Sequence, residues 1–204
     1  MIDFLATFIA FFAVIDPIGT IPVFVAVTSR YDAKTKRRIA RMASLVAAGI
    51  LIFFILVGEY ILKALSIPLP AFQISGGIVL FLFALTMIFG ESKPDEEIKL
   101  LASDHRETAI FPLAVPSIAS PGAMLAAVLL TENSRFSVWE QAQTASMMLA
   151  VILIAYVLMR LAGGITKLIG TSGASVVSRI MGLILSAIAT TNILTGLAEY
   201  YKPL

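Results

Sequence analysis

The sequence predicts an all-α, polytopic membrane helical bundle of six spans, with the first and fourth spans broken at mid-membrane. Three observations predict this class. The chain of 204 residues is 59% hydrophobic and only 14% charged, with a mean hydropathy of +0.95, whereas a soluble domain carries about 25% charged residues. Its apolar residues fall into six runs long enough to cross about 30 Å of hydrocarbon. Two of these runs are interrupted by Asp16-Pro17-Ile18-Gly19 and Ser120-Pro121-Gly122.

Polar joints and proline-containing turns delimit the six predicted spans. The first run has no basic residue ahead of it and is too long for the apolar region of a signal peptide, so we interpret it as a retained span. Pro68 and Pro70 indicate a stiff turn before the third run, and Pro112 and Pro116 weaken the start of the fourth. The predicted spans are residues 4–27, 42–62, 72–89, 110–130, 145–161 and 176–197, and the joints are residues 28–41, 63–71, 90–109, 131–144 and 162–175.

Lysine and arginine residues are concentrated after the first, third and fifth spans. These joints and the adjoining span ends hold twelve of the fifteen basic residues. Because basic residues mark the cytoplasmic side of a membrane protein, we expect both termini to lie outside. The six basic residues between positions 30 and 41 would also suit nucleic acid or anionic lipid. Their place beside a span favours the topology signal, so the lipid bilayer is an expected partner and nucleic acid is not.

The chain divides into two halves with the same order of features. Residues 1–100 and 101–204 would each form a three-helix repeat, and each begins with an interrupted span. Residues 74–78 of the third span resemble residues 180–184 of the sixth. An odd number of spans per half places the halves in opposite orientations, which is the inverted repeat of many transporters. We therefore expect residues 1–204 to form a single membrane domain with that architecture.

The two breaks form the candidate binding site. An Asp or Ser before Pro is a helix-start signal, because the side-chain oxygen caps free N–H groups and Pro suits the first helical position. At membrane depth such a break survives only where it is buried in protein or lines a cavity. Each restart also brings the positive end of a helix dipole near the midplane, where two such ends would hold a carboxylate. The candidate substrate-binding residues are Asp16, Pro17, Ile18, Gly19, Thr20, Ser120, Pro121, Gly122 and Ala123.

Asp16 is the only ionisable residue near the centre of any predicted span. It either caps the second half of its helix or contacts a ligand ammonium and couples transport to protons, and the sequence leaves both roles open. Gln73, Thr191 and Asn192 are candidates for a secondary polar lining, although interhelical hydrogen bonding is the favoured role for such residues. Glu59 lies near a span end, where charged side chains reach the interface. Small residues that predict close helix packing are Gly49, Ser75, Gly76, Gly77 and Gly182.

The composition excludes several other classes of function. The chain has no cysteine and a single histidine, His105, which excludes disulfides, iron–sulfur clusters and multi-histidine metal sites. It holds no HExxH, GxSxG, P-loop or dinucleotide-binding motif in a suitable context. We therefore expect no enzyme activity, no cofactor and no metal.

Residues 16–24, Asp-Pro-Ile-Gly-Thr-Ile-Pro-Val-Phe, resemble the DPxGN-x-P-x-F signature of the MarC/SnatA family of small bacterial and archaeal membrane proteins. Residues 111–123 resemble that family's FPLA-x-P and GPGA motifs, and residues 74–77 are similar to its Ile-x-Gly-Gly element. Thr20 stands where Asn is usual, and Ser120 where Gly is usual. The resemblance implies six spans, both termini outside the inner or plasma membrane of a prokaryote, and proton-dependent transport of glycine or alanine.

The favoured function is secondary transport of a small zwitterionic solute such as glycine, alanine or serine, by alternating access around the two broken helices. The N–H groups near residues 18–20 and 122–123 would hold the carboxylate, and Asp16, Thr20 or Ser120 would contact the ammonium. A small-solute or ion channel and an exporter of another small metabolite are the alternatives. Transport direction, proton coupling and oligomeric state stay open.

Overall fold

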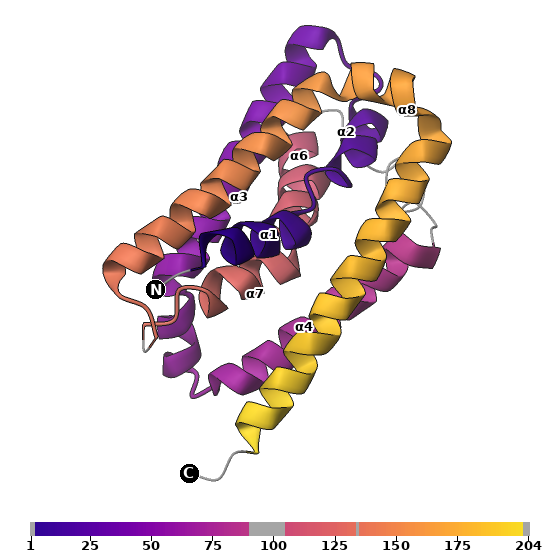
Figure 1. Cartoon of the computed structure of the whole chain (residues 1–204). Coiled ribbons are helices and arrows are strands. Elements are labelled where there is room, and N and C mark those ends of the chain that lie inside the picture. Colours follow the sequence, from indigo (N-terminus) through magenta and orange to yellow (C-terminus); the bar gives the residue numbers. More distant parts are fainter. Residues whose placement is uncertain (1–2, 90–104, 134, 202–204) are drawn as a thin grey trace.

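The chain is described by a computed structural model that covers residues 3–89, 105–133 and 135–201. Every regular element within those ranges is helical, which confirms the predicted all-α bundle (Figure 1). The elements are α1 (Phe4–Ile15), α2 (Thr20–Thr28), α3 (Ala33–Ala64), α4 (Leu69–Phe89), α6 (His105–Thr108), η1 (Ala109–Ile118), α7 (Pro121–Leu129) and α8 (Val138–Tyr200).

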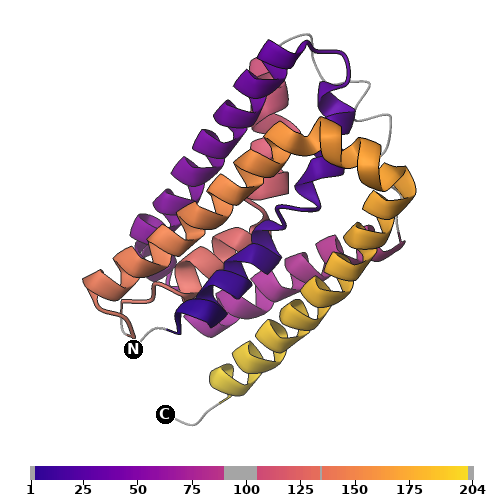
Figure 2. The same cartoon turned by 45° about the horizontal axis from the view of Figure 1, so that its top comes forward.

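All six predicted spans have counterparts in the structure. Five segments are long and apolar enough to cross a membrane: Phe4–Thr28, Ala33–Ala64, Leu69–Phe89, Val138–Ile165 and Arg179–Tyr200. The sixth counterpart is a pair, Arg106–Ile118 and Pro121–Leu129, bent by 56°. The start of α1 and the end of α8 lie toward the same end of the bundle (Figures 1 and 2), which is the arrangement expected if the bent pair counts as a sixth span.

Helix α3 begins earlier than expected, so the prediction that residues 28–41 form a joint is wrong for most of that stretch. Asp32 caps the helix, because its carboxylate accepts hydrogen bonds from the N–H groups of Lys34 (3.2 Å) and Thr35 (3.3 Å). The Thr35 side chain and these N–H groups lower the pKa of Asp32. The basic residues from Lys34 to Arg41 therefore lie on a helix.

The predicted joint at residues 162–175 is wrong as a loop, because α8 is helical throughout. The helix turns over between its two span-length legs, Val138–Ile165 and Arg179–Tyr200 (Figures 1 and 2). No proline occurs between the legs, so every residue there keeps the backbone N–H that a helix needs. Residues 90–104 of another predicted joint lie outside the described residues.

Glycines bring α4 and the second leg of α8 close together. A Cβ at Gly77 would lie 2.8 Å from Ile193 Cγ1 and 3.0 Å from the Ala189 carbonyl oxygen. Gly182 and Gly196 approach backbone carbonyls of α4 equally closely, each at 3.0 Å from its would-be Cβ. Since real Cβ atoms do not reach 2.8 Å, only glycine allows the two helix backbones this separation.

The packing roles predicted for the small residues are confirmed for Gly76, Gly77 and Gly182. Gly76 fits against the Leu125 side chain of α7, whose Cδ2 would lie 2.7 Å from an added Cβ. The prediction for Gly49 is wrong within the part of the chain that the structure describes, where no atom lies within 4 Å of its would-be Cβ and the residue is exposed on α3. Ser75 is also exposed.

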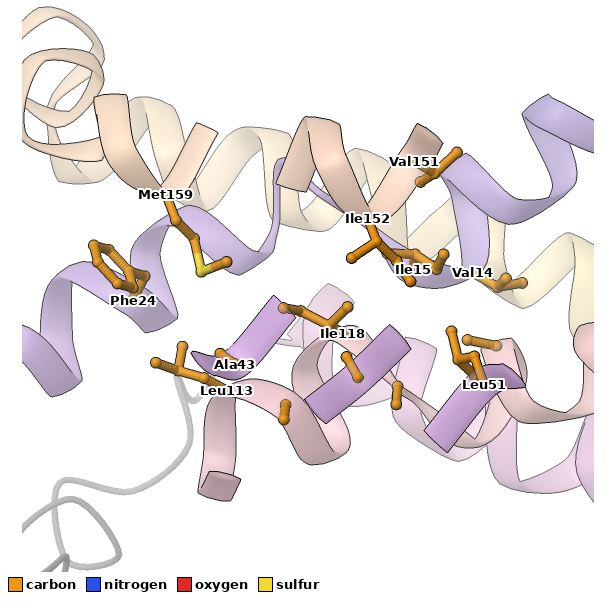
Figure 3. Packing of buried hydrophobic residues seen from close by; sticks show 14 of the residues in the cluster. Val14, Ile15, Phe24, Ala43, Leu51, Leu113, Ile118, Val151, Ile152 and Met159 are labelled. Carbon is orange, nitrogen blue, oxygen red and sulfur yellow. The ribbon is translucent and has the colours of Figure 1, made fainter. Parts of the chain in front are cut away.

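The apolar core surrounds the two breaks. Ile15 from the end of α1, Ile118 from the end of η1 and Ile152 from α8 are at most 4% exposed. Figure 3 shows Ile15 and Ile152 side by side, with Ile118 facing them. Both helix interruptions therefore lie within the apolar core of the bundle.

Candidate functional site

The break in the first span is a buried turn around Asp16. Helix α1 ends at Ile15, Asp16 adopts a left-handed backbone (φ 48°), and α2 begins at Thr20; Asp tolerates this conformation better than most residues. Its Oδ1 accepts the Gly19 N–H (2.9 Å), and its carbonyl accepts both the hydroxyl (3.0 Å) and the N–H (3.1 Å) of Thr20. Asp16 is 5% exposed, and Pro17 is buried beside it.

Asp16 therefore occupies much of the positive end of α2, through its carboxylate and through its backbone carbonyl. Open N–H groups are predicted here, but those of Gly19 and Thr20 bond to Asp16, and that of Ile21 bonds to the Ile18 carbonyl (3.1 Å). The helix starts two residues later than Ile18 because this turn comes first. A Cβ at Gly19 would overlap Asp16 Oδ2, so the glycine makes room for the carboxylate.

The break in the fourth span is a helix start of the predicted kind. Ser120 caps α7, because its Oγ accepts the Ala123 N–H (3.1 Å) and Pro121 occupies the first helical position. Gly122 is buried, and a Cβ there would lie 2.5 Å from Leu80 Cδ1. The close approach that this glycine permits is to α4.

Irregular backbone precedes that start. Phe111 (φ −126°, ψ 129°) and Val115 (φ −130°, ψ 126°) are extended inside η1. Each precedes a proline, Pro112 or Pro116, and a residue before proline is pushed out of the helical region. The fourth span is therefore irregular over its first half, as its prolines predict.

The two breaks meet through hydrogen bonds between residues 97 and 106 positions apart in the sequence. Ser120 Oγ donates to the Val14 carbonyl of α1 (2.8 Å), and Ser117 Oγ donates to Thr20 Oγ1 (3.3 Å). Thr20 and Ser120 are 1% and 0% exposed. The carbonyl left open at the end of α1 is thus paired without water. Both breaks contribute to one buried polar cluster.

The proposed secondary lining lies outside this cluster's hydrogen bonds. Gln73 is buried on α4 and Asn192 is half-buried on α8. Thr191 is exposed, and its hydroxyl donates to the Ala187 carbonyl of its own helix (2.9 Å). A lining role for these three residues stays a prediction.

Sequence reasoning missed a polar network at the bundle end near the start of α1 and the end of α8. Glu59 of α3 accepts the Asn133 N–H (2.8 Å) and pairs with Lys63 (2.6 Å). Arg135 pairs with Glu199 at the end of α8 (3.0 Å). We call Glu59, Asn133, Arg135 and Glu199 the end network. It ties α3 and α8 to the connection between α7 and α8, and the interface location of Glu59 stays a prediction.

A smaller contact bridges the two halves at the opposite end. The hydroxyl of Tyr31, which follows α2, lies 3.3 Å from Thr108 Oγ1 in α6. The guanidinium of Arg30 lies 5.2 Å from the centre of the Tyr31 ring, a favourable cation–π arrangement. Contacts between segments of the two halves therefore occur at both ends of the bundle, through Glu59 with Asn133 and through Tyr31 with Thr108.

Comparisons with known proteins agree over almost the whole chain. Residues 1–201 match a family model described as MarC family integral membrane protein. A UPF0056 membrane protein of Methanocaldococcus jannaschii is 34% identical over 200 residues, which cover 95% of each chain. Further UPF0056 membrane proteins match from Archaeoglobus fulgidus (33% identity, 96% of this chain and 92% of the relative) and Buchnera aphidicola (30% identity, 99% and 100%). No solved structure matches the chain.

Proposed function

Because the chain belongs to the MarC family of integral membrane proteins, we propose that it is a secondary transporter of small neutral amino acids such as glycine, alanine and serine. One observation carries the proposal: two interrupted spans meet at their breaks, through Ser120 with the Val14 carbonyl and Ser117 with Thr20. Interrupted helices that face each other within the bilayer are where secondary transporters bind their solutes.

A zwitterion suits the groups that meet there. The Asp16 carboxylate is a partner for an ammonium group, and it has a second oxygen besides the one that accepts the Gly19 N–H. The start of α7 is a partner for a carboxylate. The solute carboxylate would accept the hydrogen bond of the Ala123 N–H in place of Ser120 Oγ. Leu80 packs against Gly122, and this close packing beside the start of α7 favours a solute with a small side chain.

Alternating access requires the breaks to become reachable from one end at a time. We propose that the end network closes one route and the Tyr31–Thr108 contact closes the other. Breaking one set of contacts while the other persists exposes the cluster to a single side. Exchange of a proton for the solute ammonium at Asp16 would couple the cycle to a proton gradient.

Counterflow in proteoliposomes tests the proposal. Vesicles preloaded with unlabelled glycine should take up labelled external glycine, whereas protein-free vesicles should not. Alanine should compete, but propionate and ethylamine should not, because each lacks one of the two charged groups. The variant Thr190→Ala is a matched control, since this exposed hydroxyl only bonds to the Ser186 carbonyl (2.8 Å). Folded protein without counterflow of glycine, alanine or serine would refute the assignment.

The proposed location is the inner or plasma membrane of a prokaryote, with both termini outside. The chain has no cysteine, so single cysteines report on sidedness without background. We expect Tyr201→Cys to react with an impermeant maleimide in intact cells and Ser29→Cys to react only after permeabilisation, since both positions are exposed. The reverse pattern would show that the orientation predicted from the basic residues is wrong and that both termini lie inside.

Removing Arg135 is expected to open the outer route. A cysteine at Thr20, which is 1% exposed, should react several-fold faster with external reagent in Arg135→Ala, because the link to Glu199 is lost. Arg160→Ala is the matched control, since Arg160 is exposed, bonds to the Tyr156 hydroxyl within its own helix (3.2 Å) and lies outside the end network. Equal reaction rates in the two variants would contradict a gating role for the end network.

A further inference from the structure

Four basic residues form a stripe along one face of α3. Lys34, Arg37, Arg38 and Arg41 are spaced by three or four positions, so their side chains lie on the same face of the helix. All four residues are exposed, and Ile39 on the opposite face is fully buried. We call these four residues the basic stripe.

The basic stripe is electrostatically unfavourable for α3 taken alone. Like charges three and four positions apart repel each other, and the first turns of a helix already carry partial positive charge. The first turn of α3 holds no acidic residue. Within residues 3–89, 105–133 and 135–201, no acidic side chain makes a salt bridge with the stripe. The Asp32 carboxylate at the N-cap offsets the helix dipole, but it does not pair with the basic side chains, so an external anion would relieve their repulsion.

The row of residues that follows Arg41 at spacings of four along α3 turns apolar. Leu45 is 65% exposed and Phe53 is 47% exposed. Gly49 lies between them. No atom of the described residues lies within 4 Å of its would-be Cβ, so the surface of the helix is open there. Phe53 lies twelve positions after Arg41, which is a rise of roughly 18 Å at 1.5 Å per residue, close to one leaflet of a hydrocarbon core about 30 Å thick.

We propose that this face of α3 binds an anionic phospholipid lengthwise, with the phosphate on the basic stripe and an acyl chain along Leu45, Gly49 and Phe53. Along α3 the cationic surface is followed by an apolar surface, which is the order of headgroup and acyl chain in a phospholipid. A free phosphate would use only the first part of that surface. The proposal is independent of which solute the protein moves.

The melting temperature of the purified full chain in mixed micelles tests the proposal. Phosphatidylglycerol should raise it by roughly 5 °C or more above phosphatidylcholine with identical acyl chains. The triple variant Arg37→Gln, Arg38→Gln, Arg41→Gln should lose this difference. In phosphatidylcholine alone the triple variant should melt higher than the wild type, because the repulsion within the stripe is relieved. A folded variant that keeps the full difference would overturn the proposal.

Two matched controls distinguish the effect of the basic stripe from that of general surface charge, and the contribution of the acyl chain from that of the lipid headgroup. Arg179→Gln removes one exposed arginine outside the stripe and should leave the phosphatidylglycerol effect intact, whereas Arg38→Gln should reduce it. Gly49→Phe should reduce the effect by obstructing the acyl chain, and Gly49→Ala should not. Equal effects of Arg179→Gln and Arg38→Gln would overturn the assignment to α3.

The source of the anion is decided by two further additions. Inorganic phosphate and glycerol 3-phosphate at the same concentration should not reproduce the effect, and 0.5 M NaCl, where the screening length is roughly 4 Å, should weaken it. A full effect of inorganic phosphate would replace the lipid by a free anion and refute the proposal. Because melting is read without transport, absence of glycine counterflow leaves this result unaffected.

Discussion

Replacing Asp16 with Asn is expected to lower glycine counterflow by at least about 10-fold while the protein stays folded. The amide oxygen of Asn can still accept the Gly19 N–H that Asp16 Oδ1 accepts at 2.9 Å. The negative charge that would pair with the solute ammonium is lost, however, and a hydrogen bond to a charged group contributes about 1.5–3 kcal/mol. That range corresponds to roughly 10- to 150-fold in binding. Initial counterflow rates, normalised to monodisperse protein, measure the effect.

The control for this exchange is Asp3→Asn. Asp3 caps α1 by accepting the Ala6 N–H (3.0 Å) and is exposed, so the same chemical change there should leave counterflow near the wild-type rate. Gly19→Ala should resemble Asp16→Asn, because the added Cβ displaces the carboxylate. Wild-type counterflow in Asp16→Asn would reduce Asp16 to a structural cap.

Replacing Gly77 with Leu is expected to be the most destabilising single change in the bundle. The added Cβ would meet Ile193 at 2.8 Å and the Ala189 carbonyl oxygen at 3.0 Å, before the rest of the side chain is placed. Backbone cannot move aside as a flexible side chain can, so α4 and α8 must separate. Overpacking of this kind costs typically 1–3 kcal/mol and occasionally more. We expect a fall of at least about 2 kcal/mol in the free energy of unfolding, measured in urea or by thermal melting.

Gly49→Leu is the matched control for that prediction. The same Gly-to-Leu exchange is made in another span. There, no atom of the described residues lies within 4 Å of the new Cβ. Leu also has a higher helix propensity than Gly by roughly 0.8 kcal/mol. The variant should therefore melt at or above the wild-type temperature. A similar loss of stability in both variants would mean that the α4–α8 contact is looser than described.

Local rules predict those parts of the site that depend only on neighbouring residues. Ser120 and Pro121 start α7 as expected, because a cap and the first helical position involve residues three apart at most. Pro112 and Pro116 distort the fourth span for an equally local reason. A cap is one of the two roles that the sequence leaves open for Asp16, and its carboxylate does accept a nearby N–H, but its left-handed backbone delays the start of α2 to Thr20.

Contacts between distant segments are not predictable in this way. Hydropathy does not reveal that Ser120 reaches the Val14 carbonyl or that Ser117 reaches Thr20. It also does not separate Gly77, which packs against α8, from Gly49, which faces outward. Charge counts place Arg135 and Glu199 at one end, but their pairing depends on where α8 ends after its turn.

We propose that the two breaks part each time a solute passes, and a reversible cross-link between them prevents this movement. Thr20 Oγ1 and Ser117 Oγ lie 3.3 Å apart, and the chain has no cysteine of its own. Oxidation of the double variant Thr20→Cys, Ser117→Cys can therefore form an intramolecular disulfide only between these two positions. The oxidised protein should lose glycine counterflow and regain it on reduction, and each single variant should be insensitive to oxidant. Oxidised protein that is fully cross-linked and still carries out counterflow at the reduced rate would contradict the account.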